Sequence, residues 1–348
     1  MQIVSQEKLV KCAWVAVLLL GIAAPFRLVA QESGHSSVQS AGTVEDWTSL
    51  SLKGSELKPE APLAGERADL PEFTRELIQV KWRMGDAIDL YVIRPKNVPK
   101  PPVILYLYSY PSETDRFRNN DYCARITQNG FAAVGFVSAL TGQRFVMRPM
   151  KEWFVSELQE SLASSVHDVQ LILNYLAERG DLDMSRVGMF GTGSGATIAI
   201  LAAAIDPRIQ TIDLLEPWGD WPDWLAKSSI IPENERANYL KPEFLKKVAP
   251  LDPVQWLPRL KTEHIRMQNI SDDTVTPKVA QDRMEAAVPS QAKVQHFETG
   301  QRFYSTAAGG RIFEWIKQQM QAASPTQPPT EAMRAAPAAA RDSGATSQ

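Results

Sequence analysis

Apolar and polar positions in the first half of the chain follow two strand patterns. Phe73–Trp82 and Ala87–Arg94 alternate with the period of two expected of half-buried strands, and the Met-Gly-Asp sequence between them predicts a hairpin. Pro102–Tyr108 and Phe131–Val137 are continuous apolar runs, which are typical of strands covered on both faces. The pattern therefore predicts an antiparallel hairpin followed by buried strands.

Helical patterns alternate with the later strands. We expect helices at Asp121–Asn129, Ser156–Arg179, Ala196–Ile205, Lys278–Ala287 and Ala307–Met320, and strands at Arg186–Phe190, Ile209–Leu214, Glu263–Gln268 and Ala292–Glu298. Such alternation implies right-handed crossovers, so the sequence predicts an α/β fold with a mostly parallel central sheet and helices on both faces.

The two ends of the chain differ from this middle part. Residues 1–30 carry Lys8 and Lys11 before the apolar run Cys12–Ala24, which is too short to span a bilayer and is typical of a secretory signal. We expect residues 31–70 to form a polar leader, 71–322 the α/β domain with an insertion at about 216–258, and 323–348 a disordered tail rich in Pro, Ala, Ser and Thr. The sequence predicts an exported protein, periplasmic or extracellular, without a stable membrane span once the signal is cleaved.

Composition narrows the classes of partner. The chain has 348 residues, of which 44% are hydrophobic, and its 37 Lys and Arg against 40 Asp and Glu give a net charge of −3. With no basic excess or basic stripe, we expect no nucleic-acid partner. Two cysteines cannot build a disulfide framework, and Cys123 is predicted to be a lone buried thiol.

A glycine-rich corner separates the predicted strand Arg186–Phe190 from the helix that follows it. The corner reads Gly191, Thr192, Gly193, Ser194, Gly195. Tyr175–Pro207 closely resembles the strand, nucleophile elbow and helix of α/β-hydrolases, in particular the dienelactone hydrolase and acetyl xylan esterase or peptidase-like branches, and the resemblance extends over roughly residues 73–320. In the family's G-x-S-x-G register the nucleophile position is Gly193, and Ser194 comes one residue late.

The resemblance also locates the other two catalytic positions. In Asn269–Pro277, Asp273 precedes the proline by four residues and matches the family's orienting acid. The family's base histidine follows the last strand, and the matching position here is Gln301, which cannot act as a general base. The acid position is therefore kept, whereas the nucleophile and base positions hold residues without the required chemistry.

Several of these residues have a second interpretation. Ser194 is either a helix N-cap or, if the register differs by one, the nucleophile of an active enzyme, with His296 as its base. Asp273 is either an Asx-turn residue or a ligand contact. His296 is either a structural histidine of the last strand or that base.

Candidate ligand-binding residues lie at the carboxyl ends of predicted strands, where open α/β sheets bind their ligands. They are Ser109, Tyr110, Glu216, Trp218 and Trp221. The tryptophans at 218, 221 and 224 form either an aromatic wall for a ligand or a plug that packs the insertion onto the domain. We expect neither a metal nor another cofactor.

Two functions follow from the sequence. The first is a secreted hydrolase homologue with a degenerate catalytic site, which binds a small-molecule, acyl or carbohydrate-like ligand or a protein partner. The alternative is an active serine esterase or peptidase-like hydrolase that uses Ser194, Asp273 and a base such as His296. The sequence leaves the oligomeric state open.

Overall fold

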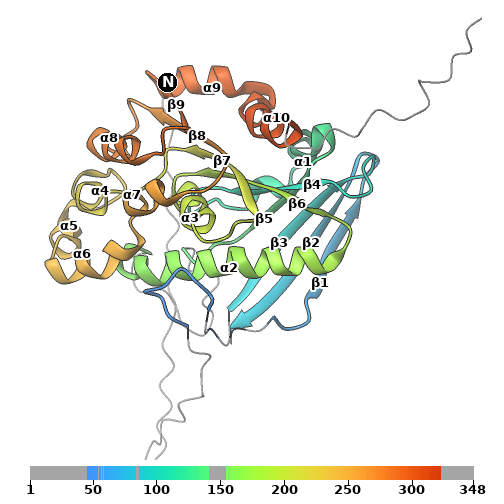
Figure 1. Ribbon diagram of the computed structural model, residues 1–348, viewed down its shortest axis with the longest axis horizontal. Coiled ribbons are helices and arrows are strands. Elements are labelled where there is room, and N and C mark those ends of the chain that lie inside the picture. Colours follow the sequence, from blue (N-terminus) through green and yellow to red (C-terminus); the bar gives the residue numbers. More distant parts are fainter. Residues whose placement is uncertain are drawn as a thin grey trace, which may run out of the picture. The chain divides into compact units, whose positions relative to one another are not determined.

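The protein is represented by a computed structural model (Figure 1), which describes residues 45–53, 55, 57, 59–83, 86–140 and 154–322. The expected signal segment and the expected tail lie outside the described residues. Within the described residues, no helix is both long and apolar enough to cross a membrane.

Nine strands of the described chain form one sheet in the order β1-β2-β3-β5-β4-β6-β7-β8-β9. The strands β1, β2, β3 and β5 pair antiparallel in that order, and every pair from β5 through β4 to β9 is parallel. This arrangement confirms the predicted sheet and its leading hairpin. The strands are β1 (Leu63–Asp69), β2 (Phe73–Arg83), β3 (Asp86–Pro95), β4 (Pro102–Leu107), β5 (Ala132–Phe136), β6 (Asp183–Thr192), β7 (Ile209–Leu215), β8 (His264–Ile270) and β9 (Lys293–Phe297).

Helices cover both faces of the sheet because its central strands are apolar on both sides. In β4, Val103 and Leu105 pack into one core, and Ile104 and Tyr106 pack into the other. Figure 1 shows α2 (Leu158–Arg179) along one face, where α3 (Ser194–Ala203) also packs, and α1 (Asn120–Thr127) and α10 (Glu314–Ala322) on the opposite face. The buried Cys123 of α1 is a free thiol, as predicted.

The predicted insertion forms small helices between β7 and β8. They are α4 (Trp221–Lys227), α5 (Glu233–Tyr239), α6 (Pro242–Val248) and α7 (Pro253–Trp256). The ring centroid of Trp224 lies 5.0 Å from that of Trp218 and 5.7 Å from that of Trp221, and all three rings are buried in the main core. The tryptophans therefore attach this insertion to the domain.

Two parts of the fold differ from the sequence prediction. No regular element was expected between residues 31 and 70, yet β1 lies there and pairs with β2; its residues are nearly all exposed, so it shows no apolar alternation. The single helix predicted at Ala307–Met320 is wrong. The chain forms α9 (Gly300–Ala307), a 3₁₀ segment (Ala308–Phe313) and α10, because Gly309 and Gly310 adopt positive φ angles of 69° and 89°.

The described beginning of the chain is held against α2 by a buried charge cluster. The guanidinium of Arg83 contacts both oxygens of Glu45, at 2.5 and 2.6 Å, and Oδ1 of Asp168 at 2.5 Å. His167 lies with Nδ1 2.6 Å from Glu45 Oε1 and Nε2 2.9 Å from the carbonyl oxygen of Ser49. Burial by itself raises the pKa of Glu45, but the hydrogen bonds from Arg83 and His167 lower it overall to about 2.

Candidate functional site

The corner between β6 and α3 has the strained backbone that the sequence predicted for an elbow. Gly193 adopts φ 52° and ψ −121°, and its N–H donates to the carbonyl oxygen of Leu215 at 2.9 Å. A Cβ on Gly191 would lie 2.5 Å from Cα of Ala196, and one on Gly195 would lie 2.1 Å from the carbonyl oxygen of Leu107. The two flanking glycines therefore allow the close packing of this turn, and Gly193 is its apex.

The space beside the apex is already occupied. A Cβ on Gly193 would lie 2.5 Å from Oγ and 2.9 Å from Cβ of Ser109, and 3.1 Å from Nε1 of Trp218. Ser109 is held there because its backbone N–H donates to Oγ1 of Thr192 at 3.1 Å. A Cβ at position 193 would therefore require Ser109 to shift.

Ser194 is fully buried in the first turn of α3. Its Oγ accepts a hydrogen bond from the backbone N–H of Tyr110 at 2.9 Å and lies 3.5 Å from Oγ of Ser109. The helix N-cap is Gly193, so the expectation that Ser194 is the N-cap is wrong. Ser194 is also absent from the residues that line the neighbouring cavity.

Neither position considered for a base, Gln301 or His296, lines the cavity beside this corner. Gln301 is exposed in the first turn of α9 and does not line the cavity. The side chain of His296 in β9 is 54% exposed, and its Nδ1 lies 3.5 Å from Oε1 of Glu285. Like His296, the other two described histidines, His167 and His264, are absent from the cavity lining.

Asp273 lies in the loop after β8 and lines the cavity. Its Oδ1 accepts from the N–H of Val275 at 3.1 Å, and its Oδ2 accepts from the N–H of Thr276 at 3.0 Å. These are the hydrogen bonds of an Asx-type turn, in which the carboxylate organises its own loop.

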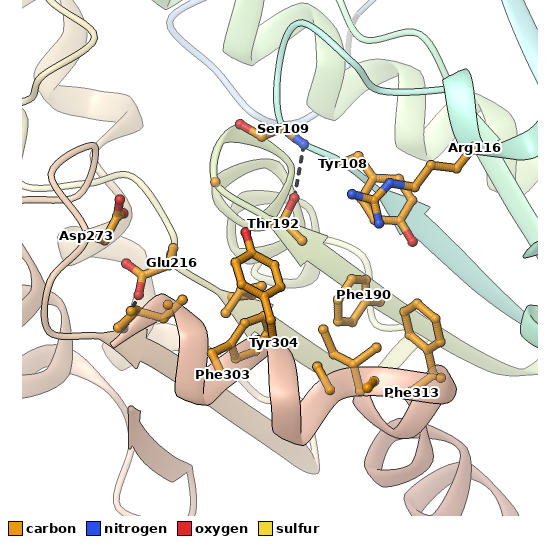
Figure 2. A pocket seen from close by; sticks show the side chains of 18 of the residues that line it. Tyr108, Ser109, Arg116, Phe190, Thr192, Glu216, Asp273, Phe303, Tyr304 and Phe313 are labelled. Carbon is orange, nitrogen blue, oxygen red and sulfur yellow. Dashed lines mark hydrogen bonds between the residues drawn. The ribbon is translucent and has the colours of Figure 1, made fainter. Parts of the chain in front are cut away.

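Glu216 and Asp273 form a carboxyl pair at one side of the cavity (Figure 2). Glu216 follows β7 with a φ of 50°, and its carboxyl group accepts from the N–H of Ile270. Burial, and then the negative charge of Asp273, raise the pKa of Glu216 to about 9. The raised pKa favours the protonated form of Glu216 at neutral pH.

A cavity of about 700 Å³ opens beside these residues. Of the predicted ligand-binding residues it is lined by Ser109, Glu216 and Trp218, whereas Tyr110 and Trp221 do not contact it. Much of the remaining wall is aromatic or aliphatic, with contributions from Phe190, Leu215, Ile270, Phe303, Ile312 and Phe313. Within the described chain, no group of three or more His, Cys, Asp or Glu side chains is arranged to hold a metal ion.

The opposite side of the cavity holds residues that the sequence analysis missed. The guanidinium carbon of Arg116 lies 4.7 Å from the ring centroid of Tyr108, and the hydroxyl groups of Tyr108 and Tyr122 contact each other. Burial raises the pKa of Tyr108 to about 12 and raises that of Tyr122, which favours the neutral form of both phenols. Tyr108 lies at the carboxyl end of a predicted strand, so the expectation that ligands bind at such ends could have identified it. Arg116 and Arg125 lie beyond that strand, and no sequence pattern pointed to them.

The parallel sheet, the strained turn between β6 and α3, and the acid loop after β8 define the class of this protein as the α/β-hydrolase fold. A family model for the X-Pro dipeptidyl-peptidase (S15) family matches residues 84–324, and the chain belongs to this family.

Solved structures share the same fold at low sequence identity. Acetyl xylan esterase 1 from a Thermoanaerobacterium species has a TM-score of 0.59 and 15% identity, and the match covers 77% of this chain and 89% of the esterase. An acetyl xylan esterase from a Paenibacillus species has a TM-score of 0.57 and 14% identity over 78% of this chain and 90% of the esterase. No curated protein matches the sequence.

Proposed function

We propose that this protein binds a small molecule in the cavity beside Gly193 and does not perform hydrolysis by a Ser-His-Asp triad. The observation that carries the proposal is that the apex of the elbow is Gly193, which has no side chain, with Ser109 close against the position that a Cβ would occupy.

The chemistry of the neighbouring residues supports the same function. A serine hydroxyl becomes nucleophilic only when a base accepts its proton. Oγ of Ser194 is instead buried against the N–H of Tyr110, and the base position holds the exposed Gln301. Both carboxyl oxygens of Asp273 already accept backbone N–H groups.

The cavity itself supports a binding role. Small-molecule sites commonly enclose about 300–1,000 Å³ and combine apolar walls with a few polar groups, and this cavity matches both criteria. The solved relatives are named for acetyl xylan, which favours an acyl or carbohydrate-like ligand among small molecules.

Fluorophosphonate labelling of the purified protein tests the proposal. We expect no labelling of the wild type, of Ser194→Ala or of Gly193→Ser, while an active serine esterase in the same experiment is labelled. A wild type that is labelled and loses the label in Ser194→Ala would show that Ser194 is a working nucleophile. Ester turnover that persists in Ser194→Ala would indicate chemistry at another residue.

We also propose that the protein works outside the cytoplasm. The basic residues and apolar run of residues 1–30 support export. Cell fractionation, together with the N-terminal sequence of the exported protein, tests this proposal. A full-length protein found only in the cytoplasm would contradict it.

A further inference from the structure

Two arginines lie at one side of the cavity without an acidic partner. Arg116 comes from the 3₁₀ turn Asp115–Arg118, and Arg125 comes from the last turn of α1. Neither guanidinium forms an ion pair within the residues that the structure describes. By contrast, Arg83, Arg179 and Arg266 each contact at least one carboxylate.

The Arg116 side chain and the backbone at Arg125 are each held by a neighbouring residue. Arg116 lies over the Tyr108 ring, which restricts the plane of its guanidinium. The buried amine of Lys317 donates to the carbonyl oxygens of Arg125, at 3.2 Å, and Gln128, at 2.9 Å, and so fixes the end of α1. The hydroxyls of Tyr108 and Tyr122 bond to each other beside these arginines, which leaves one O–H able to donate to a ligand.

The charges in the cavity are separated. Figure 2 shows Arg116 and Tyr108 on one side, Glu216 and Asp273 on the other, and the aromatic rings of Phe190, Phe303 and Phe313 below and between them. A molecule that spans the cavity therefore meets positive charge at one end, apolar rings in the middle and the acidic residues Glu216, Asp272 and Asp273 at the far end.

We infer that the ligand is an amphipathic organic acid whose carboxylate binds Arg116 and Arg125 and whose apolar body lies against Phe190, Phe303 and Phe313. This inference rests on the proposed binding function and specifies its ligand. A guanidinium matches a carboxylate in shape and charge, and the pairing is stronger than a hydrogen bond between neutral groups. The acidic residues Glu216, Asp272 and Asp273 at the other end of the cavity disfavour a second carboxylate, so the site selects a monocarboxylate.

Calorimetric titration of the full-length protein with matched compounds tests the inference. The first series is octanoate, octanamide and octylamine, and the second is phenylbutanoate with its amide and amine. We expect each carboxylate to bind at least about tenfold more tightly than its amide, since a hydrogen bond to a charged group contributes roughly 1.5–3 kcal/mol. The amines should bind more weakly than the amides, because a positively charged amine is repelled by the guanidinium groups of Arg116 and Arg125.

Substitutions test whether Arg116 and Arg125 bind the carboxylate. Arg116→Ala and Arg125→Ala should each weaken carboxylate binding about tenfold and leave amide binding unchanged. Arg259→Ala is the matched control, because the Arg259 guanidinium also lies over an aromatic ring, 4.9 Å from the centroid of Trp256, but does not line the cavity.

The outcomes separate this inference from the proposed function. Equal binding of acid and amide, or carboxylate binding that survives both arginine substitutions, overturns the inference and leaves ligand binding intact. If no compound of either series binds and the wild type reacts with the fluorophosphonate, both the inference and the proposed function are wrong. If no compound binds and no labelling occurs, the carboxylate inference is overturned.

Discussion

The side chain of Ser109 occupies the position into which a side chain at residue 193 would project, with its Oγ 2.5 Å from a Cβ built on Gly193. Ser109 follows β4 and Gly193 follows β6, and these strands are neighbours in the sheet. Restoring a nucleophile therefore needs changes at both positions, in addition to a base.

Gly193→Ala should be markedly destabilising. A non-glycine residue in this backbone region costs about 1–2 kcal/mol, and the contact with Ser109 adds roughly 1–3 kcal/mol of overpacking. Gly180→Ala separates the two effects, because Gly180 also has a positive φ, of 72°, but a Cβ there meets nothing within 4 Å. Urea unfolding measures both variants.

A double-mutant cycle tests the steric part. Ser109→Gly combined with Gly193→Ala should recover stability beyond the sum of the single changes, with a coupling of about 1–2 kcal/mol. Additive effects would mean that Ser109 does not limit position 193.

Glu216→Gln should change how the free energy of unfolding depends on pH. It should change the free energy of unfolding near neutral pH less. Because the pKa of Glu216 is raised to about 9 from 4.5, the folded state binds more protons than the unfolded state between these values. Its contribution to stability is fully present below pH 4.5 and is lost as the pH rises through 9. Glutamine mimics the protonated acid, so the variant should lose this slope.

Unfolding free energies measured from pH 5 to 9 check this expectation. Glu298→Gln is the control, because Glu298 has an 80% exposed side chain and should leave the slope unchanged. Identical slopes in Glu216→Gln and the wild type would show that Glu216 is ionised in the folded protein.

Glu45→Gln should detach the beginning of the described chain from α2. Arg83 loses its bidentate carboxylate but keeps Asp168 and Asp86, so the expected cost is below the roughly 3–5 kcal/mol of a buried charge left without any partner. Since the pKa of Glu45 is lowered to about 2, its contribution is present above pH 4.5 and is lost as the pH falls through 2.

Acid titration of unfolding, together with limited proteolysis near residue 45, measures this effect. The control is Glu60→Gln, which breaks the exposed pair with Lys81 and should cost less than about 1 kcal/mol. Equal effects of the two substitutions would contradict a stabilising role for the buried cluster.

Most of the sheet was predictable because its strands are buried on both faces and their apolar runs are unambiguous. The strand β1 was missed because an exposed edge strand has no apolar face to reveal it. The break between α9 and α10 was missed because the amphipathic pattern of Ala307–Met320 continues across Gly309 and Gly310, which turn the chain.

The candidate site was only partly accessible to the sequence. The family resemblance pointed to Gly193 and Asp273, which line the cavity, and to Gln301, which does not. The raised pKa of Glu216 depends on burial and on a carboxylate from another loop, and the arrangement of Arg116 and Arg125 depends on how α1 packs. No local pattern encodes contacts of this kind.

Adjacent aromatic residues on α9 should respond to substitution in opposite ways. Phe303 is 3% exposed and packs on Phe297, so Phe303→Ala should cost about 3–5 kcal/mol of stability. Tyr304 lines the same cavity but is 71% exposed, so Tyr304→Ala removes little buried area and should change the unfolding free energy by less than about 0.5 kcal/mol.

If the cavity binds an amphipathic acid, Tyr304→Ala should nevertheless weaken octanoate binding severalfold, because the ring becomes buried only when a ligand covers it. Leu63→Ala, at a residue that is 66% exposed in β1 and away from the cavity, should change neither quantity. Loss of stability in Tyr304→Ala without loss of affinity would assign Tyr304 to the fold instead of the binding site.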